Sequence, residues 1–181
     1  MIDSDIDAII EKTKKWITDV VIGCNFCPFA AKEVKRDSIH YEVLTNANTK
    51  NALAAIMRLL YQLDDNNAIE TSLLIMPGSF LQFDEYLKLL KQAEKLLAKE
   101  NYKGIYQVAS FHPHYLFAES TDSDPSNYTN RSPFPMLHFL REESVTKAID
   151  SYPDIDKVPK RNIAFTKEKG LAYMQKLSGQ Q

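Results

Sequence analysis

Proton carriers and rigid prolines are concentrated in one stretch of this sequence, between residues 111 and 142. His112 and His114 flank a proline there, and His138 follows a long polar loop. Histidine titrates near neutral pH and serves as a general acid, a general base or a metal ligand. Such a composition is poor material for a hydrophobic core, so the stretch predicts a functional site with His112 and His138 as catalytic candidates.

The motif Cys24-x-x-Cys27 brings a second kind of reactive group. Cys27 precedes Pro28, and a helix that restarts near Phe29 would place this thiol at a helix N-terminus, where thiol pKa values are lowered. A thiol in that setting acts as a nucleophile or a redox group, which makes Cys27 the third catalytic candidate. The alternative interpretation is a small, buried hydrophobic side chain, as free cysteines often are.

The same motif also admits a metal site, in which His112 and His114 would complete the ligand set of Cys24 and Cys27. Zinc accepts two thiolates and two imidazoles, and a two-residue gap lets both sulfurs reach one ion. Two histidines separated by one residue on an extended chain point to the same face, as ligation requires. The histidine spacing differs from that of zinc fingers, so the metal site stands as an alternative and no metal is assigned.

Arg131 and Arg141 carry planar guanidinium groups that suit a carboxylate or a phosphate. Arg131 is followed by Ser132 and Pro133, and a rigid loop there can preorganise it against an anion. The alternatives are that Arg131 ties the loop to backbone carbonyls or to a nearby aspartate, and that Arg141 begins a solvated helix. The predicted substrate-binding residues are Tyr115, Asn130, Arg131, Ser132 and Arg141.

Composition and charge argue against several classes of partner. The 181 residues carry a formal charge of −2 without a basic stripe, so we expect no nucleic-acid partner. No apolar run approaches the roughly 20 residues of a membrane-spanning helix, and the acidic N-terminus does not resemble a secretion signal. We therefore expect a cytoplasmic protein without a membrane partner, whose two cysteines remain thiols. No glycine-rich phosphate loop is present, and the sequence identifies neither a cofactor nor an oligomeric state.

Apolar periodicity along the chain predicts alternating strands and helices. Strands are expected at 39–44, 71–76, 104–111 and 136–140, and helices at 5–21, 49–63, 82–99, 142–151 and 159–177. The polar loop at 119–135 contains three prolines, and long loops in compact domains are usually functional or mobile. This order predicts an α/β fold: a single layered domain over residues 1–181, with a mixed, mainly parallel sheet of four to five strands flanked by helices. The strand after the loop is the one that can pair antiparallel.

Three motifs along the chain form a specific combination. They are Cys27-Pro28-Phe29-Ala30, His112-Pro113-x-Tyr115-x-Phe117, and the run from Asn127 to His138, NYTNRSPFPMLH. Together they resemble the bacterial "domain of unknown function 1415" family, and the resemblance covers essentially the whole chain. The family carries no established activity, so the resemblance leaves the reaction open. In the family pattern Cys27 belongs to the motif, while Cys24 and His114 are particular to this chain, which disfavours a shared four-ligand metal site.

The sequence favours an enzyme that acts on a small anionic molecule. In this hypothesis Cys27 is the nucleophile or redox group, His112 or His138 is the base, and Arg131 holds the anion. The motifs are expected to meet at the carboxyl ends of the strands, where open α/β sheets form clefts. The alternatives are the Cys2His2 metal site and a non-catalytic module in which the 119–135 loop closes over a ligand or a partner.

Overall fold

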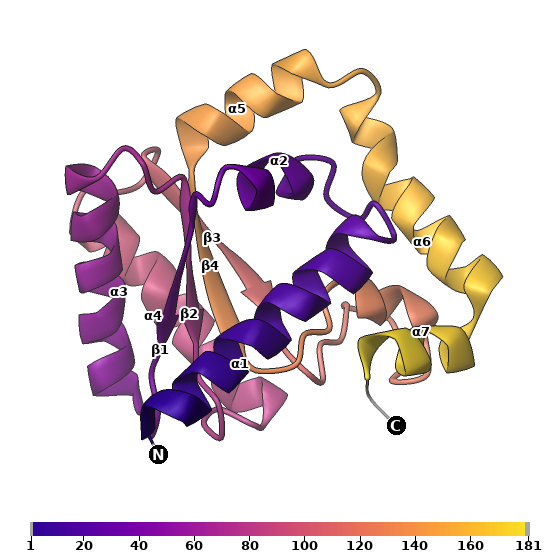
Figure 1. The fold of residues 1–181 in the computed structure, drawn as a ribbon, viewed down its shortest axis with the longest axis horizontal. Helices are drawn as coiled ribbons and strands as arrows, with labels where there is room; N and C mark the ends of the chain where they lie inside the picture. Colours follow the sequence, from indigo (N-terminus) through magenta and orange to yellow (C-terminus); the bar gives the residue numbers. More distant parts are fainter. Residues whose placement is uncertain (1, 180–181) are drawn as a thin grey trace.

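The computed structural model describes residues 2–179, with side chains from residue 5 onward, and centres on a four-stranded sheet with helices on both faces (Figure 1). The strands are β1 (Ile39–Val43), β2 (Thr71–Ile75), β3 (Tyr106–Phe111) and β4 (Met136–Arg141). Each strand overlaps a predicted strand, and β2 is buried at every position because helices cover both of its faces. The predicted α/β class is therefore confirmed, with four strands.

The strand order is β1-β2-β4-β3, and only the β1–β2 pair is parallel. β4 is antiparallel to both of its neighbours, β2 and β3. The prediction of a mainly parallel sheet is therefore wrong, although the predicted β-α-β-α-β order does occur. The long loop after β3 returns the chain to Met136, which pairs with both Ile75 and Phe111. β4 thereby lies between β2 and β3 and prevents these two strands from pairing with each other in parallel.

The first face of the sheet is covered by two long helices. These are α3 (Thr49–Asp65) and α4 (Phe83–Lys99). α3 begins at a capping box, in which the side chains of Asn48 and Asn51 each accept a hydrogen bond from the other residue's amide. Both helices turn an apolar stripe toward Leu74, Leu137 and Phe139 of the sheet. We call this cluster of buried residues the first core.

The second face packs against helices from both ends of the chain, and we call the buried residues there the second core. These helices are α1 (Ile2–Trp16), its π-helical continuation η1 (Ile17–Ile22) and α7 (Leu171–Ser178). Trp16 anchors them, because its indole N–H donates to the Arg131 carbonyl oxygen at 3.0 Å. Its ring also meets the Phe111 ring edge-on, with the centroids 5.2 Å apart. α1 is thus fixed both to the sheet and to the loop before β4.

The remaining helical segments are α2 (Ala30–Lys35), η2 (Pro125–Thr129), α5 (Glu142–Ser151), η3 (Ile155–Lys157) and α6 (Val158–Lys169). The single helix predicted over 159–177 is wrong, because α6 and α7 are separate helices on either side of Gly170. Gly170 has a φ of 81° and a ψ of 165°. That conformation is accessible to glycine and ends the run of helical hydrogen bonds.

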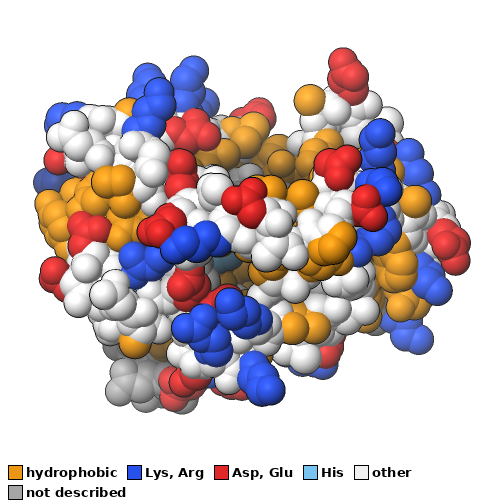
Figure 2. All heavy atoms as spheres, turned by 90° about the horizontal axis from the view of Figure 1, so that it is seen from above, with side chains coloured by type: hydrophobic (Ala, Val, Ile, Leu, Met, Phe, Trp, Pro, Cys, Tyr) orange, Lys and Arg blue, Asp and Glu red, His pale blue; other side chains and the backbone are white. Residues whose placement is uncertain are grey.

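One end of the second face is only partly covered. α5 follows directly from β4, arches over this end of the sheet and has no buried residue (Figure 1). Beneath it, Ala109, His138 and Leu140 are half-buried and Gln107 is exposed. We call these four residues the open end. The face seen from the α5 side is hollowed, and apolar side chains gather around the hollow (Figure 2).

Candidate functional site

His138 lies in the middle of β4 and projects from the second face of the sheet. Its cross-strand partner is Leu73 of β2, and its ring centroid lies 6.1 Å from that of Phe111. Because side chains alternate along a strand, Leu137 and Phe139 on either side of it belong to the first core instead. The imidazole is therefore a half-buried polar group on a largely apolar surface.

One hydrogen bond determines the tautomer of the His138 ring, that is, which of its two nitrogens carries the proton. Its Nε2 lies 2.5 Å from Thr71 Oγ1, and that hydroxyl donates its only proton to the Phe139 carbonyl oxygen, 2.6 Å away. Thr71 Oγ1 can therefore only accept, which assigns the imidazole proton to Nε2 and leaves a lone pair on Nδ1. Among the described residues, none donates to Nδ1. Burial lowers the pKa of His138 to about 4, so the ring is neutral at pH 7.

Both cysteines lie on the same side of the sheet as His138. Cys24 is buried in the second core, Cys27 is half-buried against it, and both are free thiols. α2 begins at Ala30, so the predicted restart of a helix just after Cys27 is confirmed. Burial raises the pKa of the Cys24 thiol, while the charge of Lys169 opposes that shift. Cys27 is thus the more accessible of the two sulfurs.

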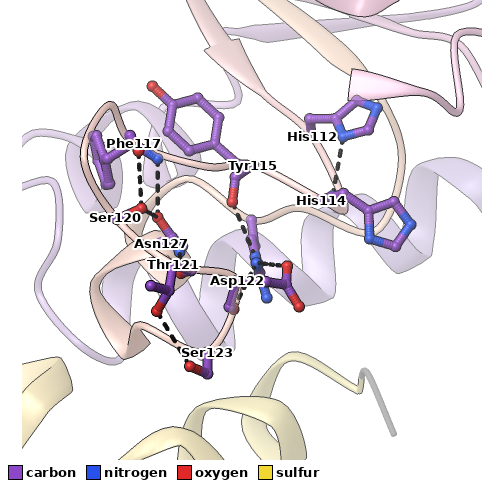
Figure 3. Close-up of polar contacts among 10 residues, drawn as sticks. His112, His114, Tyr115, Phe117, Ser120, Thr121, Asp122, Ser123 and Asn127 are labelled. Atoms are coloured by element: carbon purple, nitrogen blue, oxygen red, sulfur yellow. Dashed lines mark hydrogen bonds and ion pairs between the residues drawn. The ribbon is translucent and has the colours of Figure 1, made fainter. Parts of the chain in front are cut away.

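His112 lies one residue beyond β3 and turns toward the first core. It is fully buried, with ring centroids 5.2 Å from Phe83 and 4.9 Å from Tyr86 of α4. Its Nε2 donates to the Phe80 carbonyl oxygen at 2.9 Å, and its Nδ1 accepts from the His114 amide at 3.0 Å (Figure 3). Burial lowers the pKa of His112, and the bond to the Phe80 carbonyl opposes the shift. Both ring nitrogens are therefore engaged within the protein.

Among the described residues, the three predicted catalytic side chains share no hydrogen bond with one another. His112 packs into the first core, whereas Cys27 and His138 lie on the second face, so the sheet separates them. The ring nitrogens of His112 and His138 bond to other groups and to neither thiol. Within residues 5–179, no three His, Cys, Asp or Glu side chains lie close enough to hold a metal ion, so the four ligands including Cys24 and His114 are not assembled.

Arg131 is buried and binds mainly to its own loop. Its Nε donates to the Tyr115 carbonyl oxygen at 3.1 Å. Its Nη2 donates to the Asp122 carbonyl oxygen at 3.1 Å and to Asp122 Oδ1 at 2.7 Å. The guanidinium also stacks over the Tyr128 ring, 4.8 Å from the centroid. These contacts match the alternative in which Arg131 ties the loop together, while Nη1 has no partner among the described residues.

Asn127 is the second centre of the same loop, and it is fully buried. Its Oδ1 accepts from the Phe117 amide at 3.0 Å and from the Ser120 hydroxyl at 2.9 Å. Its Nδ2 donates to the Thr121 carbonyl oxygen at 2.8 Å (Figure 3). The loop is therefore a compact, self-bonded structure of the kind that presents fixed groups to a ligand.

Three other predicted binding residues join this loop to the end of β3. Asn130 Nδ2 donates to the Ser110 carbonyl oxygen at 3.2 Å, and the Ser132 amide donates to the His112 carbonyl oxygen at 3.4 Å. The Tyr115 ring contacts the Phe83 and Phe117 rings. The second and third of the three motifs thus meet at the carboxyl end of β3, which fulfils part of the expectation that all three would meet at the strand ends.

Arg141, the fifth predicted binding residue, lies at the opposite end of the sheet. Its Nη2 donates to the carbonyl oxygens of Leu63, Asn66 and Ile69, at 2.6, 3.3 and 2.9 Å. Its guanidinium also lies 5.8 Å from the centroid of the Tyr106 ring. Arg141 therefore holds the carboxyl end of α3 against the sheet. It is also the N-cap residue of α5, and its guanidinium is bound to backbone carbonyls instead of being free in solvent.

The sequence analysis assigned no role to three residues that organise these sites. Thr71, which fixes His138, is the first residue of a strand that is otherwise nearly all apolar, and a hydroxyl in such a strand is a detectable signal. Asn127 gives no comparable signal, because several asparagines and serines surround it in the loop. Tyr86 also escaped attention, although its hydroxyl donates to the Met136 carbonyl oxygen and accepts from the Phe111 amide, which joins β3 to β4.

The described helices include none with both the length and the apolar character needed to cross a bilayer. Searches of curated proteins and of solved structures gave no match. The family described as "Protein of unknown function (DUF1415)" matches residues 8–176, which is most of the chain. The motif resemblance seen in the sequence is thereby confirmed, and the chain belongs to the DUF1415 family.

Proposed function

We propose that this protein is an enzyme that acts on a small anionic molecule bound at the open end of the sheet, with His138 as the proton acceptor and Cys27 as the nucleophile. The observation that carries the proposal is the unshared lone pair on His138 Nδ1. An imidazole that is held in one orientation by Thr71 and unpartnered at its other nitrogen is placed to accept a proton.

The chemical step follows from these two groups. The Cys27 thiol gives its proton to His138 Nδ1, and the thiolate sulfur forms a bond to an electrophilic carbon of the substrate as a leaving group departs. The low pKa of His138 means that the imidazolium forms only beside the new negative charge. Substrate binding is proposed to bring the two side chains together, since catalytic hydrogen bonds that are absent from the free protein often form only in the complex.

Arg131 takes two roles in this proposal. Its engaged nitrogens hold the loop at the end of the sheet opposite to the open end, and the charge at Nη1 attracts the anionic substrate over that distance without contacting it. The guanidinium is buried and its partner Asp122 is largely exposed, so solvent screens the carboxylate more than it screens the arginine. A positive field therefore remains at Nη1.

Alkylation of Cys27 tests the proposal, because iodoacetate is itself a small anionic electrophile. In a Cys24→Ser background, the rate with iodoacetate relative to neutral iodoacetamide should exceed the ratio measured for free cysteine. His138→Asn should slow both reagents at pH 7 by about tenfold, the lower end of the usual contribution of a general base. The exposed residue His114 provides the matched control, His114→Asn.

Two outcomes would count against an enzyme. One is a Cys27 that reacts with both reagents at the rates of free cysteine, and the other is an alkylation rate that His138→Asn leaves unchanged. Arg131→Gln, which removes the charge, should lower the preference for iodoacetate and leave the iodoacetamide rate unchanged. Circular dichroism and urea unfolding show whether each variant retains the fold.

A non-catalytic binding module is the second candidate, and one observation favours it. Cys27 packs against the apolar second core, as a structural cysteine does. In such a protein the ordered loop around Arg131 and Asn127 would contact the ligand and the thiol would be dispensable. Unchanged ligand binding by Cys27→Ala, together with a loss of binding in Arg131→Lys, would support this candidate over the enzyme.

A further inference from the structure

A groove lies between α1 and α7, away from the open end of the sheet. It has a volume of about 520 Å³, and it is lined from three segments of the chain. Its walls are formed chiefly by Lys12, Lys15, Trp16, Pro133, Tyr173 and Lys176. The volume falls within the range of roughly 300–1,000 Å³ that is typical of small-molecule sites.

The floor of the groove is apolar and rigid. Trp16 is 6% exposed and Val20 is 1% exposed, and Leu177 of α7 is half-buried beside them. The indole is held in place by its hydrogen bond to the Arg131 carbonyl and by the edge-on contact with Phe111. Pro133 closes one wall, so part of the long Asn-Arg-Ser-Pro motif contributes to the groove.

The rim of the groove carries an excess of positive charge. Lys15 forms an ion pair with Asp19, the carboxylate among the lining residues. Lys12 and Lys176 have no ion-pair partner among the described residues, and the Lys12 ammonium lies 5.3 Å from the centroid of the Phe134 ring. Two ammonium groups thus border an apolar floor without carboxylates to neutralise them, a combination that suits an anion with an apolar body.

We propose that this groove binds a small soluble organic anion, whose apolar body lies on Trp16 and Leu177 and whose carboxylate or phosphate is held by Lys12 and Lys176. The proposal uses neither Cys27 nor His138, so it stands or fails independently of the proposed reaction. The floor residue Trp16 contacts Phe111, which in turn contacts the His138 ring. Two ring contacts thus separate the floor of the groove from His138.

Trp16 is the only tryptophan of the chain, so its fluorescence reports directly on the groove. Titration of the full chain with octanoate and with octylammonium compares two ligands of the same length and opposite charge. Octanoate should change the Trp16 emission saturably at millimolar concentration, and octylammonium should not. Binding of both ligands with equal affinity would overturn the role of the lysines.

Substitution of the lysines tests the assignment of the head group. The double variant Lys12→Gln/Lys176→Gln should bind octanoate at least about tenfold more weakly, because each charge-assisted contact is lost. Lys14→Gln is the matched control, since it makes the same change on the same helix outside this groove. Equal affinity in the double variant, or no binding to the unaltered chain, would refute the proposal.

A second copy of the chain is the competing occupant. In that case the Trp16 emission would depend on protein concentration without any ligand, and sedimentation would show a dimer that octanoate disperses. This outcome would overturn the small-molecule proposal. A monomer at all concentrations with a saturable octanoate response would uphold it.

Discussion

His112 and His138 occupy opposite faces of the same sheet and differ in how many of their ring nitrogens are used. His112 is fully buried, and both of its nitrogens bond to the backbone of neighbouring segments. His138 bonds only through Nε2, to Thr71, and keeps a lone pair on Nδ1. Burial lowers the pKa of both histidines, so protonation alone does not separate their roles.

The comparison teaches that hydrogen-bond saturation distinguishes a structural histidine from a chemical one. A ring with two engaged nitrogens has nothing to offer a substrate unless the fold opens. A ring held by one nitrogen is both oriented and available, which is the arrangement that catalysis requires. His112 therefore belongs to the scaffold in our interpretation, and His138 belongs to the proposed site.

Replacement of His112 should produce the largest effect. His112→Ala removes a buried ring between Phe83 and Tyr86 and leaves the Phe80 carbonyl and the His114 amide without partners. We expect the free energy of unfolding to fall by about 4 kcal/mol, measured by urea denaturation. His112→Phe keeps most of the packing and should lose about half of that amount. A decrease in the free energy of unfolding of less than about 1 kcal/mol in His112→Ala would show that the two hydrogen bonds contribute little to stability.

Acid should destabilise the protein through His138. Its pKa is about 4 in the folded chain and near 6.5 in the unfolded chain, so the unfolded state binds more protons between these values. The contribution to stability is fully present above pH 6.5 and is lost as the pH falls through 4. A complete shift corresponds to about 3 kcal/mol, and the partial exposure of the ring reduces the expected loss to ~2 kcal/mol.

The matched measurement is urea unfolding of the unaltered chain and of His138→Gln from pH 7.5 to pH 4. His40, which is half-buried, and His112, which is buried, also have lowered pKa values and contribute to both curves, so the difference between the curves isolates His138. If the two curves run parallel, His138 is not held neutral by burial, and the contrast with His112 disappears.

The sequence predicted the elements of the fold better than their arrangement. Apolar patterns identified all four strands and the two helices of the first face, because the helices bury one regular stripe and β2 is a short, fully buried apolar run. It did not predict that β4 lies between β2 and β3, because strand order depends on where the long loop leads the chain. One continuous helix was predicted over 159–177, since a sequence does not reveal the φ of 81° at Gly170 that separates α6 from α7.

The candidate site was predictable in its residue types and less so in its grouping. The motifs marked His112, Arg131 and His138, but the hydrogen bonds that divide their roles join residues far apart in the sequence. Thr71 and His138 are 67 positions apart, and Trp16 and the Arg131 carbonyl are 115 apart. Strand alternation does carry one usable signal, because it places His138 opposite to Leu137 and Phe139.

A more selective change concerns the hydroxyl that orients His138. Thr71→Val keeps the shape of the side chain but removes the donor to the Phe139 carbonyl and the acceptor for Nε2–H. We expect a loss of about 1 kcal/mol in stability, measured by urea unfolding. Nitrogen NMR of histidine-labelled protein should show an unprotonated Nδ1 at His138 in the unaltered chain and a mixture of tautomers in the variant. An Nδ1 that is already protonated in the unaltered chain would contradict the assigned network.

The smallest effect is expected at His114. Two substitutions there distinguish the contribution of its backbone amide to the hydrogen bonding of His112 from the contribution of its side chain. The His114 amide donates to His112 Nδ1, whereas the His114 ring is exposed and only approaches the His112 ring at 5.9 Å. His114→Ala keeps the amide, so the free energy of unfolding should change by less than about 0.5 kcal/mol. His114→Pro removes the amide proton and should destabilise the protein far more, because the buried His112 Nδ1 then loses its hydrogen-bond donor. Similar stabilities of these two variants would show that His112 is held by packing alone, and the distinction drawn from its two engaged nitrogens would fail.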